Sequence, residues 1–126
     1  MKSKLVKQWF KYAATDLKVA KNSLSFSAEF KAISAFHSQQ CAEKAIKGYL
    51  LYHKVRFPKS HDIGTLVDLV ATFETEISKK IRKSEVLTEY AVSYRYPEEA
   101  EQTPMTMAKA RSAIKLAEMV LEACKV

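Results

Sequence analysis

Hydrophobic and small residues recur at steps of three and four along most of this 126-residue chain. Near the N-terminus, Trp9, Ala13, Leu17, Ala20 and Leu24 keep this spacing and would line one face of a helix. Equivalent patterns follow later in the chain. They predict five helices, the third of them short, over about residues 5–24, 29–52, 63–73 and 78–94 and from Pro104 to the C-terminus.

The second predicted helix differs from the others because apolar residues surround most of its circumference. Such a helix belongs at the centre of a fold, packed on more than one side. Its few polar residues are therefore the informative ones, and they are His37, Gln39, Gln40, Glu43 and Lys44. Long helices with short connections pack antiparallel. We expect an all-α fold, an antiparallel up-and-down bundle of four long helices plus one short helix.

The predicted helix boundaries follow from capping residues and prolines. Ser60 or Asp62 can cap the short third helix. The segment 97–102, PEEAEQ, is expected to form an acidic surface loop after the fourth helix. Thr103 followed by Pro104 favours a helix start, since Thr can cap the helix and Pro fits its first turn.

Composition supports this assignment. Gly occurs twice and Pro three times, far fewer turn residues than sheets and hairpins require. The length suits one domain, residues 1–126. No apolar stretch approaches the ~20 residues of a membrane span or forms a signal peptide, so we expect a cytoplasmic protein without membrane segments. Cys41 and Cys124 fit two reduced core thiols better than a disulfide framework.

The net charge is +7, from 21 Lys and Arg against 14 Asp and Glu. A basic protein favours anionic partners, such as nucleotides, RNA or an acidic protein. Basic residues are also ordinary on solvated helix faces, and charge alone does not choose between these interpretations.

Four polar residues of the second helix form the first candidate site. His37, Gln40 and Lys44 are spaced three and four apart, so they share a face, and Glu43 lies beside Gln40. This set could bind a nucleotide or stabilise a phosphate. It could equally satisfy its own hydrogen bonds across a helix interface, as buried polar groups usually do. Both interpretations stay open at the level of sequence.

A second candidate lies at the end of the fourth predicted helix, where Arg95 stands between Tyr94 and Tyr96. A guanidinium beside aromatic faces suits a phosphate with a stacked base. In the alternative interpretation, Arg95 caps the last helix carbonyls and the tyrosines pack.

His61 stands next to Asp62 at a predicted helix start, so the two could form an acid–base pair or a helix cap. No metal site is expected, because His37, His53 and His61 match no ligand spacing. With two glycines in the whole chain, a glycine phosphate loop is excluded, and we expect no cofactor.

Several segments together resemble the HEPN domain family. They are AFHSQQCAEKAIKGYLL, PKSHDIGTLV, LTEYAVSYRYP and the Ala-rich AIKLAEMVLE, preceded by WFKYAATDLKVAKNSL. The resemblance covers essentially the whole chain and rests above all on QQ-x-AEKA-x-K and YR-Y-P. It implies a bundle of four to five helices that commonly forms homodimers and works near nucleotides or RNA.

The resemblance also implies a partner and a chemistry. Many HEPN proteins act beside a minimal nucleotidyltransferase, often as the toxin of a toxin–antitoxin pair. Others are metal-independent ribonucleases whose signature is Arg, four to six residues, then His. In that pair, His exchanges protons at the RNA 2′-hydroxyl while Arg stabilises charge on the phosphorus centre.

This sequence departs from the ribonuclease signature, because no histidine follows Arg95. Arg56 and His61 have the right spacing, with four residues between them, but they lie in a segment that resembles the Pro-x-x-His-Asp turn of members without nuclease activity. We therefore predict binding rather than catalysis. Arg56 and His61 remain the catalytic candidates.

Three hypotheses follow. The leading one is a small nucleotide-binding or partner-binding helical module that acts with a minimal nucleotidyltransferase. Its site would be a cleft between the second and fourth predicted helices, made by Arg95, Lys44, His37, Gln40, Glu43, Tyr94 and Tyr96. The second is a metal-independent ribonuclease toxin that uses His61 with Arg56 or Arg95. The third is an oligomeric scaffold whose polar residues only fix helix register.

Overall fold

A computed structural model describes residues 2–102 and 104–126; the side chains of residues 93–95, 99, 100 and 102 lie outside the described part. All regular structure in these residues is helical, which confirms the predicted fold class. The elements are α1 (Lys4–Phe26), η1 (Ala28–Phe30), α2 (Lys31–Tyr52), α3 (Ile63–Ala71), α4 (Thr75–Ile81), η2 (Arg82–Leu87), α5 (Thr88–Arg95), α6 (Pro97–Gln102) and α7 (Met107–Cys124), where η marks 3₁₀-helix.

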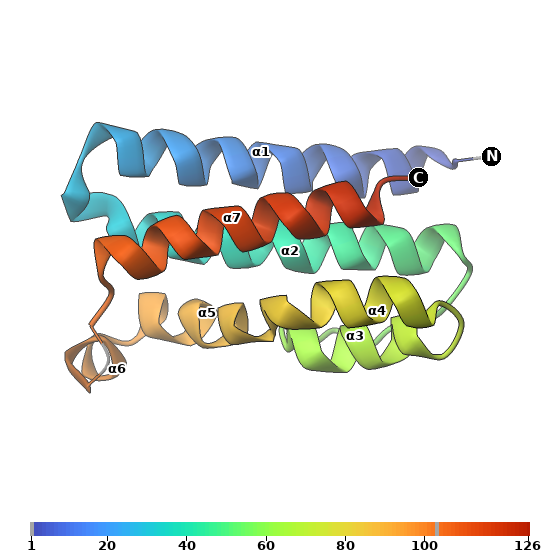
Figure 1. Ribbon diagram of the computed structural model, residues 1–126. Helices are drawn as coiled ribbons and strands as arrows, with labels where there is room; N and C mark the ends of the chain where they lie inside the picture. The colour runs from blue at the N-terminus through green and yellow to red at the C-terminus, as the bar shows by residue number, and fades with distance from the viewer. Residues whose placement is uncertain (1, 103) are drawn as a thin grey trace.

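The long helices run up and down the bundle (Figure 1). From the N-terminus, α1 runs along one edge, α2 returns, the α4–η2–α5 segment runs back, and α7 returns to end near the start of α1. No helix in the described residues is long and apolar enough to cross a membrane.

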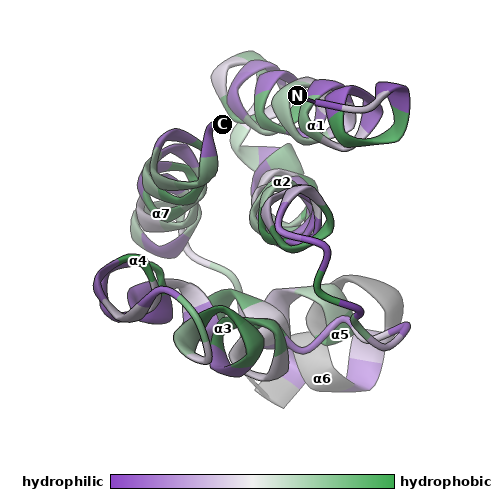
Figure 2. Ribbon diagram, turned by 90° about the vertical axis from the view of Figure 1, so that its right-hand side faces the viewer, coloured by the Kyte–Doolittle hydropathy of each residue, from purple (hydrophilic) through white to green (hydrophobic). Residues whose placement is uncertain are grey.

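Helix α2 lies at the centre of the bundle, as its all-round apolar pattern predicts. Thirteen of its 22 residues are buried, and it packs against α1, α7 and α5 (Figure 2). Gly48 allows the close approach of α1, because a Cβ added there would lie 3.1 Å from atoms of both Trp9 and Phe10.

The fourth predicted helix is broken into α4, η2 and α5, which corrects the single helix expected over 78–94. The Ser84 hydroxyl donates to the Ile81 carbonyl at 2.6 Å, a local bond that competes with the helix ladder. Arg82 donates to Glu85 of η2 and also bridges to Asp68 of α3, at 2.6 and 3.0 Å. These bonds hold the tighter 3₁₀ turns against α3.

Two further boundaries differ from expectation. Residues Pro97–Gln102 form the short helix α6 rather than a loop, with Pro97 at the first position and the Glu98 carboxylate near the favourable end of the helix dipole. Helix α7 begins at Met107, because the Thr106 hydroxyl accepts from the Lys109 N–H at 3.1 Å and acts as the N-cap. Thr103, the predicted cap, lies outside the described residues.

The loop between α2 and α3 is fixed at both ends. Lys54, with φ of 60°, turns the chain away from α2 in the left-handed region. At the other end Asp62 caps α3, accepting from the Gly64 N–H at 3.0 Å, as predicted. The Ile63 N–H donates to the Thr88 hydroxyl of α5 at 3.0 Å. The loop is therefore held in a defined place beside α2 and α5.

The two cysteines are free and buried, as expected for reduced core thiols. Burial raises the pKa of Cys41 and of Cys124 to about 12 each.

Candidate functional site

Two carboxylates, one on α1 and one on α2, each hold one histidine and one lysine. We call Asp16, His37 and Lys44 the Asp16 cluster. We call the second group the Glu43 cluster; it consists of Glu43, Lys47, His61, Gln39 and Gln40.

The Asp16 cluster joins α1 to α2. One carboxylate oxygen of Asp16 lies 2.9 Å from His37 Nδ1, and the other lies 2.6 Å from Lys44 Nζ. The side chains of His37 and Lys44 remain 27% and 25% exposed. Lys44 Nζ also lies 6.0 Å from the centre of the Tyr12 ring, a cation–π distance. The cluster thus lies at the margin of the helix interface, where water can still reach both the imidazole and the ammonium group.

The Glu43 cluster is buried more deeply and joins α2 to the following loop. Glu43 Oε2 lies 3.0 Å from Lys47 Nζ, one turn along the helix, and Oε1 lies 2.9 Å from His61 Nδ1. Gln39 Nε2 donates to Glu43 Oε1 at 3.0 Å and to the His61 carbonyl at 3.2 Å. Gln40 Nε2 extends this hydrogen-bond network by donating to Gln39 Oε1 at 2.7 Å. A carboxylate that is 5% exposed thus receives bonds from three side chains.

Lys47 lies between two aromatic rings beneath the surface. Its Nζ lies 5.9 Å from the centre of the Trp9 ring and 5.7 Å from that of Phe57, and the two rings meet edge to face with centres 6.1 Å apart. A buried ammonium requires both a counter-charge and polarisable neighbours. Glu43 supplies the charge, so Lys47 links α1, α2 and the loop into one unit.

His61 is the one member of the Glu43 cluster that reaches the surface. Its side chain is 57% exposed while its Nδ1 is held by the buried Glu43. An imidazole oriented in this way donates its Nδ1 proton to the carboxylate and presents Nε2 outward. A carboxylate behind a histidine is the arrangement that general acid–base catalysis uses. Arg56 lies exposed in the same loop.

One end of the bundle carries exposed cations without acidic neighbours in the sequence. Residues 2–15 and 44–61 contain no Asp or Glu. The first half of α1 and the loop after α2 lie at the same end (Figure 1), and the Trp9–Phe57 contact joins them. We call this surface the basic end; its exposed cations are Lys2, Lys4, Lys7, Lys11, Lys54, Arg56 and Lys59.

A cleft opens at the basic end between the two chain ends of the bundle. It has a volume of about 300 Å³ and is lined by Lys2, Lys7, Phe10, Lys125 and Val126. Lys125 is paired with Glu122 at 3.2 Å. Lys2 and Lys7 of the basic end thus border a hollow whose wall includes the Phe10 ring.

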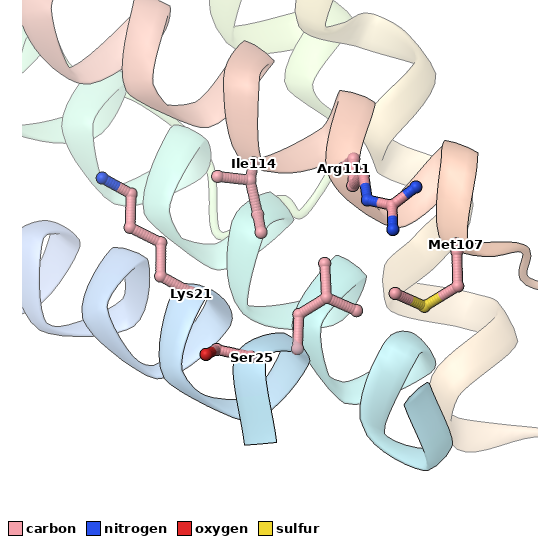
Figure 3. A pocket seen from close by; sticks show the side chains of 6 residues that line it. Lys21, Ser25, Met107, Arg111 and Ile114 are labelled. Atoms are coloured by element: carbon pink, nitrogen blue, oxygen red, sulfur yellow. The ribbon is translucent and has the colours of Figure 1, made fainter. Parts of the chain in front are cut away.

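A second groove lies at the opposite end of α1, against the start of α7 (Figure 3). It has a volume of about 310 Å³ and is lined by Lys21, Leu24, Ser25, Met107, Arg111 and Ile114. Lys21 is already paired with Glu118 at 2.9 Å. With one of its two cations neutralised, this groove is a weaker anion site than the basic end.

The predicted site residues separate into two groups on α2. His37 and Lys44 belong to the Asp16 cluster, whereas Gln40 and Glu43 belong to the Glu43 cluster. These polar side chains form hydrogen bonds and ion pairs within the protein, as in the alternative in which they satisfy their own hydrogen bonds across a helix interface.

The remaining predicted residues are Tyr94, Arg95 and Tyr96. Tyr96 is 54% exposed. The side chains of Tyr94 and Arg95 lie outside the described residues, so the proposed contact of Arg95 and Lys44 with one phosphate stays a prediction. No group of three or more metal-binding side chains occurs in the part of the chain that the structure describes.

Sequence reasoning missed two features of this region. Lys47 follows Glu43 by four residues, the spacing of an ion pair on a helix, and could have been noticed from that alone. The absence of acids from residues 2–15 and 44–61 was also visible in the sequence. The predicted antiparallel bundle already brings these two stretches to one end; the Trp9–Phe57 contact that joins them was not predicted.

Comparison with known proteins gives three matches. The family model for the HEPN domain matches residues 6–126. A protein of Methanocaldococcus jannaschii named "Putative toxin MJ1304" is 36% identical over 101 residues, which is 75% of this chain and 65% of that protein, just under two thirds of its length. The crystal structure of TT1696 from Thermus thermophilus superposes with a TM-score of 0.76 at 26% identity, covering 94% of each chain.

Proposed function

This chain belongs to the HEPN domain family, and on that premise we propose that it is a toxin-like module that binds RNA and acts together with a minimal nucleotidyltransferase.

The observation that carries this proposal is the basic end. Seven exposed cations lie there, six from α1 and the loop together with Lys2 just before α1, in stretches without a carboxylate. A spread of cations of this kind favours an extended polyanion over a single phosphate, because each phosphate contact adds to the affinity. Trp9 and Phe57 lie among these cations and offer aromatic surface to an unpaired base.

The polar residues of α2 support this surface from below. Glu43 and Gln39 bind His61 through its ring and its backbone carbonyl. This anchoring fixes the segment that presents Lys54, Arg56 and Lys59. In the proposal, therefore, the Glu43 cluster is a positioning device, and the loop is the binding element.

A nucleotidyltransferase partner and a homodimer remain parts of the proposal that rest on the family. The archaeal relative's name describes a toxin, and a toxin requires a partner that restrains it. Co-expression with a minimal nucleotidyltransferase encoded next to this chain, followed by sedimentation of the co-expressed pair, tests the partner. Sedimentation of the chain alone tests the homodimer. A chain that stays monomeric would contradict the homodimer, and a chain that does not bind the nucleotidyltransferase would contradict the partner. Neither result would contradict RNA binding.

RNA binding is tested by fluorescence anisotropy with a labelled single-stranded RNA. The variant K54A/R56A/K59A is expected to bind about tenfold or more weakly, since it loses three phosphate contacts. The matched variant K80A/K83A/K115A removes the same charge from exposed positions elsewhere and should bind nearly as well as the unmodified chain. Equal losses in the two variants, or no binding by the unmodified chain, would contradict the proposal.

A second candidate function, metal-independent RNA cleavage, is favoured by the Glu43–His61 pair. His61 Nε2 could take the proton of an RNA 2′-hydroxyl while Arg56, on the same loop, stabilises charge on the phosphate. Incubation of purified protein with RNA in chelator tests it. Cleavage that disappears in His61→Ala while binding persists would establish a ribonuclease; intact RNA would leave a binding module.

A further inference from the structure

The outer face of α1 carries an apolar stripe that the fold does not use. Leu5, Tyr12, Val19 and Phe26 recur every seven residues, and their exposed fractions are 54%, 57%, 37% and 80%. A seven-residue apolar repeat is the pattern by which one helix packs along another. Large apolar side chains exposed in a continuous row mark an interaction surface more often than chance.

This stripe is separate from the face that α1 buries within the bundle. The buried positions Val6, Ala13 and Ala20 follow one residue after Leu5, Tyr12 and Val19, about a quarter turn around the helix. Within the chain α1 packs on α2, α7 and η1, and it lies at one margin of the bundle (Figure 2). The folded core therefore accounts for the inner face and leaves the outer stripe uncovered.

The charges beside the stripe all have one sign. Lys4, Lys11 and Lys18 each precede a stripe residue and are exposed, so they form a parallel row of ammonium groups. Between the two rows lie the uncharged side chains Gln8, Thr15 and Asn22. Asp16 is the one acidic residue of α1, and both of its oxygens are already bound by His37 and Lys44.

The stripe also has an anchoring hollow at one end and an aromatic pair at the other. Leu5, Gln8, Trp9 and Tyr12 enclose a mostly apolar pocket of about 140 Å³, which is room for one branched aliphatic side chain. Twenty-one residues further on, Phe26 stacks on Phe30 with ring centres 5.6 Å apart. A row of that length spans about 30 Å, enough for a partner helix of several turns.

We propose that this face of α1 docks an acidic amphipathic helix of a partner protein. Leucine-sized residues on the partner would cover the stripe, and carboxylates flanking them would meet Lys4, Lys11 and Lys18. A second copy of α1 does not fit, because two such faces would bring lysine rows together without a free carboxylate to pair with them. Lys4 and Lys11 belong both to this face and to the basic end. The loop cations Lys54, Arg56 and Lys59 belong to the RNA surface alone, and the stripe residues Val19 and Phe26 to the docking face alone.

The test uses two synthetic peptides of about 21 residues with the same leucine stripe, one flanked by glutamates and one by lysines. Calorimetric titration of the full chain should show the acidic peptide binding at least about tenfold more tightly than the basic one. Charge reversal in Lys11→Glu with Lys18→Glu should invert this preference. The matched reversal of Lys80 and Lys83 to Glu, at exposed positions away from α1, should not.

A second variant separates this surface from the RNA site. Val19→Ser with Phe26→Ser, at two exposed positions, should lose the acidic peptide and keep RNA affinity within about twofold. K54A/R56A/K59A should do the opposite. Equal binding of both peptides, or peptide binding that survives loss of the stripe, would overturn the proposal. Self-association of the chain that disappears in the Val19→Ser, Phe26→Ser variant would also overturn the proposal, because a second copy of the chain would then cover this face of α1.

Discussion

The Asp16 and Glu43 clusters use the same three kinds of side chain and reach different results. Each sets one carboxylate against one histidine and one lysine. In the Asp16 cluster all three side chains are partly accessible, with the carboxylate 11% exposed. In the Glu43 cluster the carboxylate and the ammonium are 5% and 8% exposed, while the histidine is 57% exposed.

The different burial of the two clusters indicates which part of the molecule to test for function. The Asp16 cluster fastens α1 to α2, and both His37 and Lys44 can exchange the carboxylate for water. The Glu43 cluster buries an ion pair, at a desolvation cost of several kcal/mol. The same buried carboxylate orients the exposed imidazole of His61 on the basic loop. A costly buried pair that ends in an exposed side chain points to the loop as the functional part of the molecule.

The largest expected effect is that of Glu43→Ala. The substitution leaves the Lys47 ammonium buried between Trp9 and Phe57 without a counter-charge. Loss of one partner of a buried pair costs about 3–5 kcal/mol of unfolding free energy. Urea denaturation followed by circular dichroism measures it.

The control for this prediction replaces both partners. Glu43→Leu with Lys47→Leu removes the charge and its counter-charge together, so most of the lost unfolding free energy should return. A double variant as unstable as Glu43→Ala would mean that packing, rather than the ion pair, sets the cost.

A smaller effect is expected for Asp16→Ala, about 1–2 kcal/mol. Here the side chains of Lys44 and His37 are each about a quarter exposed, so water can replace the lost carboxylate and no ammonium is left buried without a counter-charge. The same urea experiment compares it directly with Glu43→Ala. Equal losses of unfolding free energy in Asp16→Ala and Glu43→Ala would contradict the distinction between the partly exposed Asp16 cluster and the buried Glu43 cluster.

The smallest effect concerns Cys41, which is buried on α2 like Glu43 but has no cation bound to it. Burial, and next the charge of Asp16, raise its thiol pKa from 9.0 to about 12, and burial does the same for Cys124. Above about pH 9 the unfolded chain loses thiol protons that the folded chain keeps, so the unfolding free energy falls as pH rises toward 12.

Each thiol should therefore remove about 1 kcal/mol between about pH 8 and about pH 9.7. Urea midpoints at the two pH values, for the unmodified chain and for Cys41→Ala, isolate the Cys41 thiol. The alkaline loss should be smaller in the variant by that amount. An identical loss in both would show that the thiol ionises in the folded protein.

Much of the architecture follows from the sequence for a simple reason. The three-and-four spacing that forms α1, α2 and α3 is local, and the Asp62 cap lies next to the helix it starts. The predicted fourth helix is wrong where Ser84 bonds back to the preceding turn and Arg82 bridges to α3, because hydrophobic spacing does not report such bonds.

The site was less accessible to sequence reasoning because its contacts join distant segments. His37 and Lys44 meet Asp16 across 21 and 28 residues, and His61 meets Glu43 across 18. Spacing along α2 identified polar residues worth attention. It did not say that His37 and Lys44 meet one carboxylate on α1 while Glu43 holds a histidine from the loop.

The most direct test of the central claim is the salt dependence of RNA affinity. For single-stranded RNA, the logarithm of affinity falls with the logarithm of salt concentration by about 0.7 per phosphate contact. Removing Lys54, Arg56 and Lys59 as K54A/R56A/K59A should therefore flatten the slope by about 2, while K80A/K83A/K115A should leave it unchanged. Identical slopes for the unmodified chain and the loop variant would contradict the assignment of RNA to this end of the bundle.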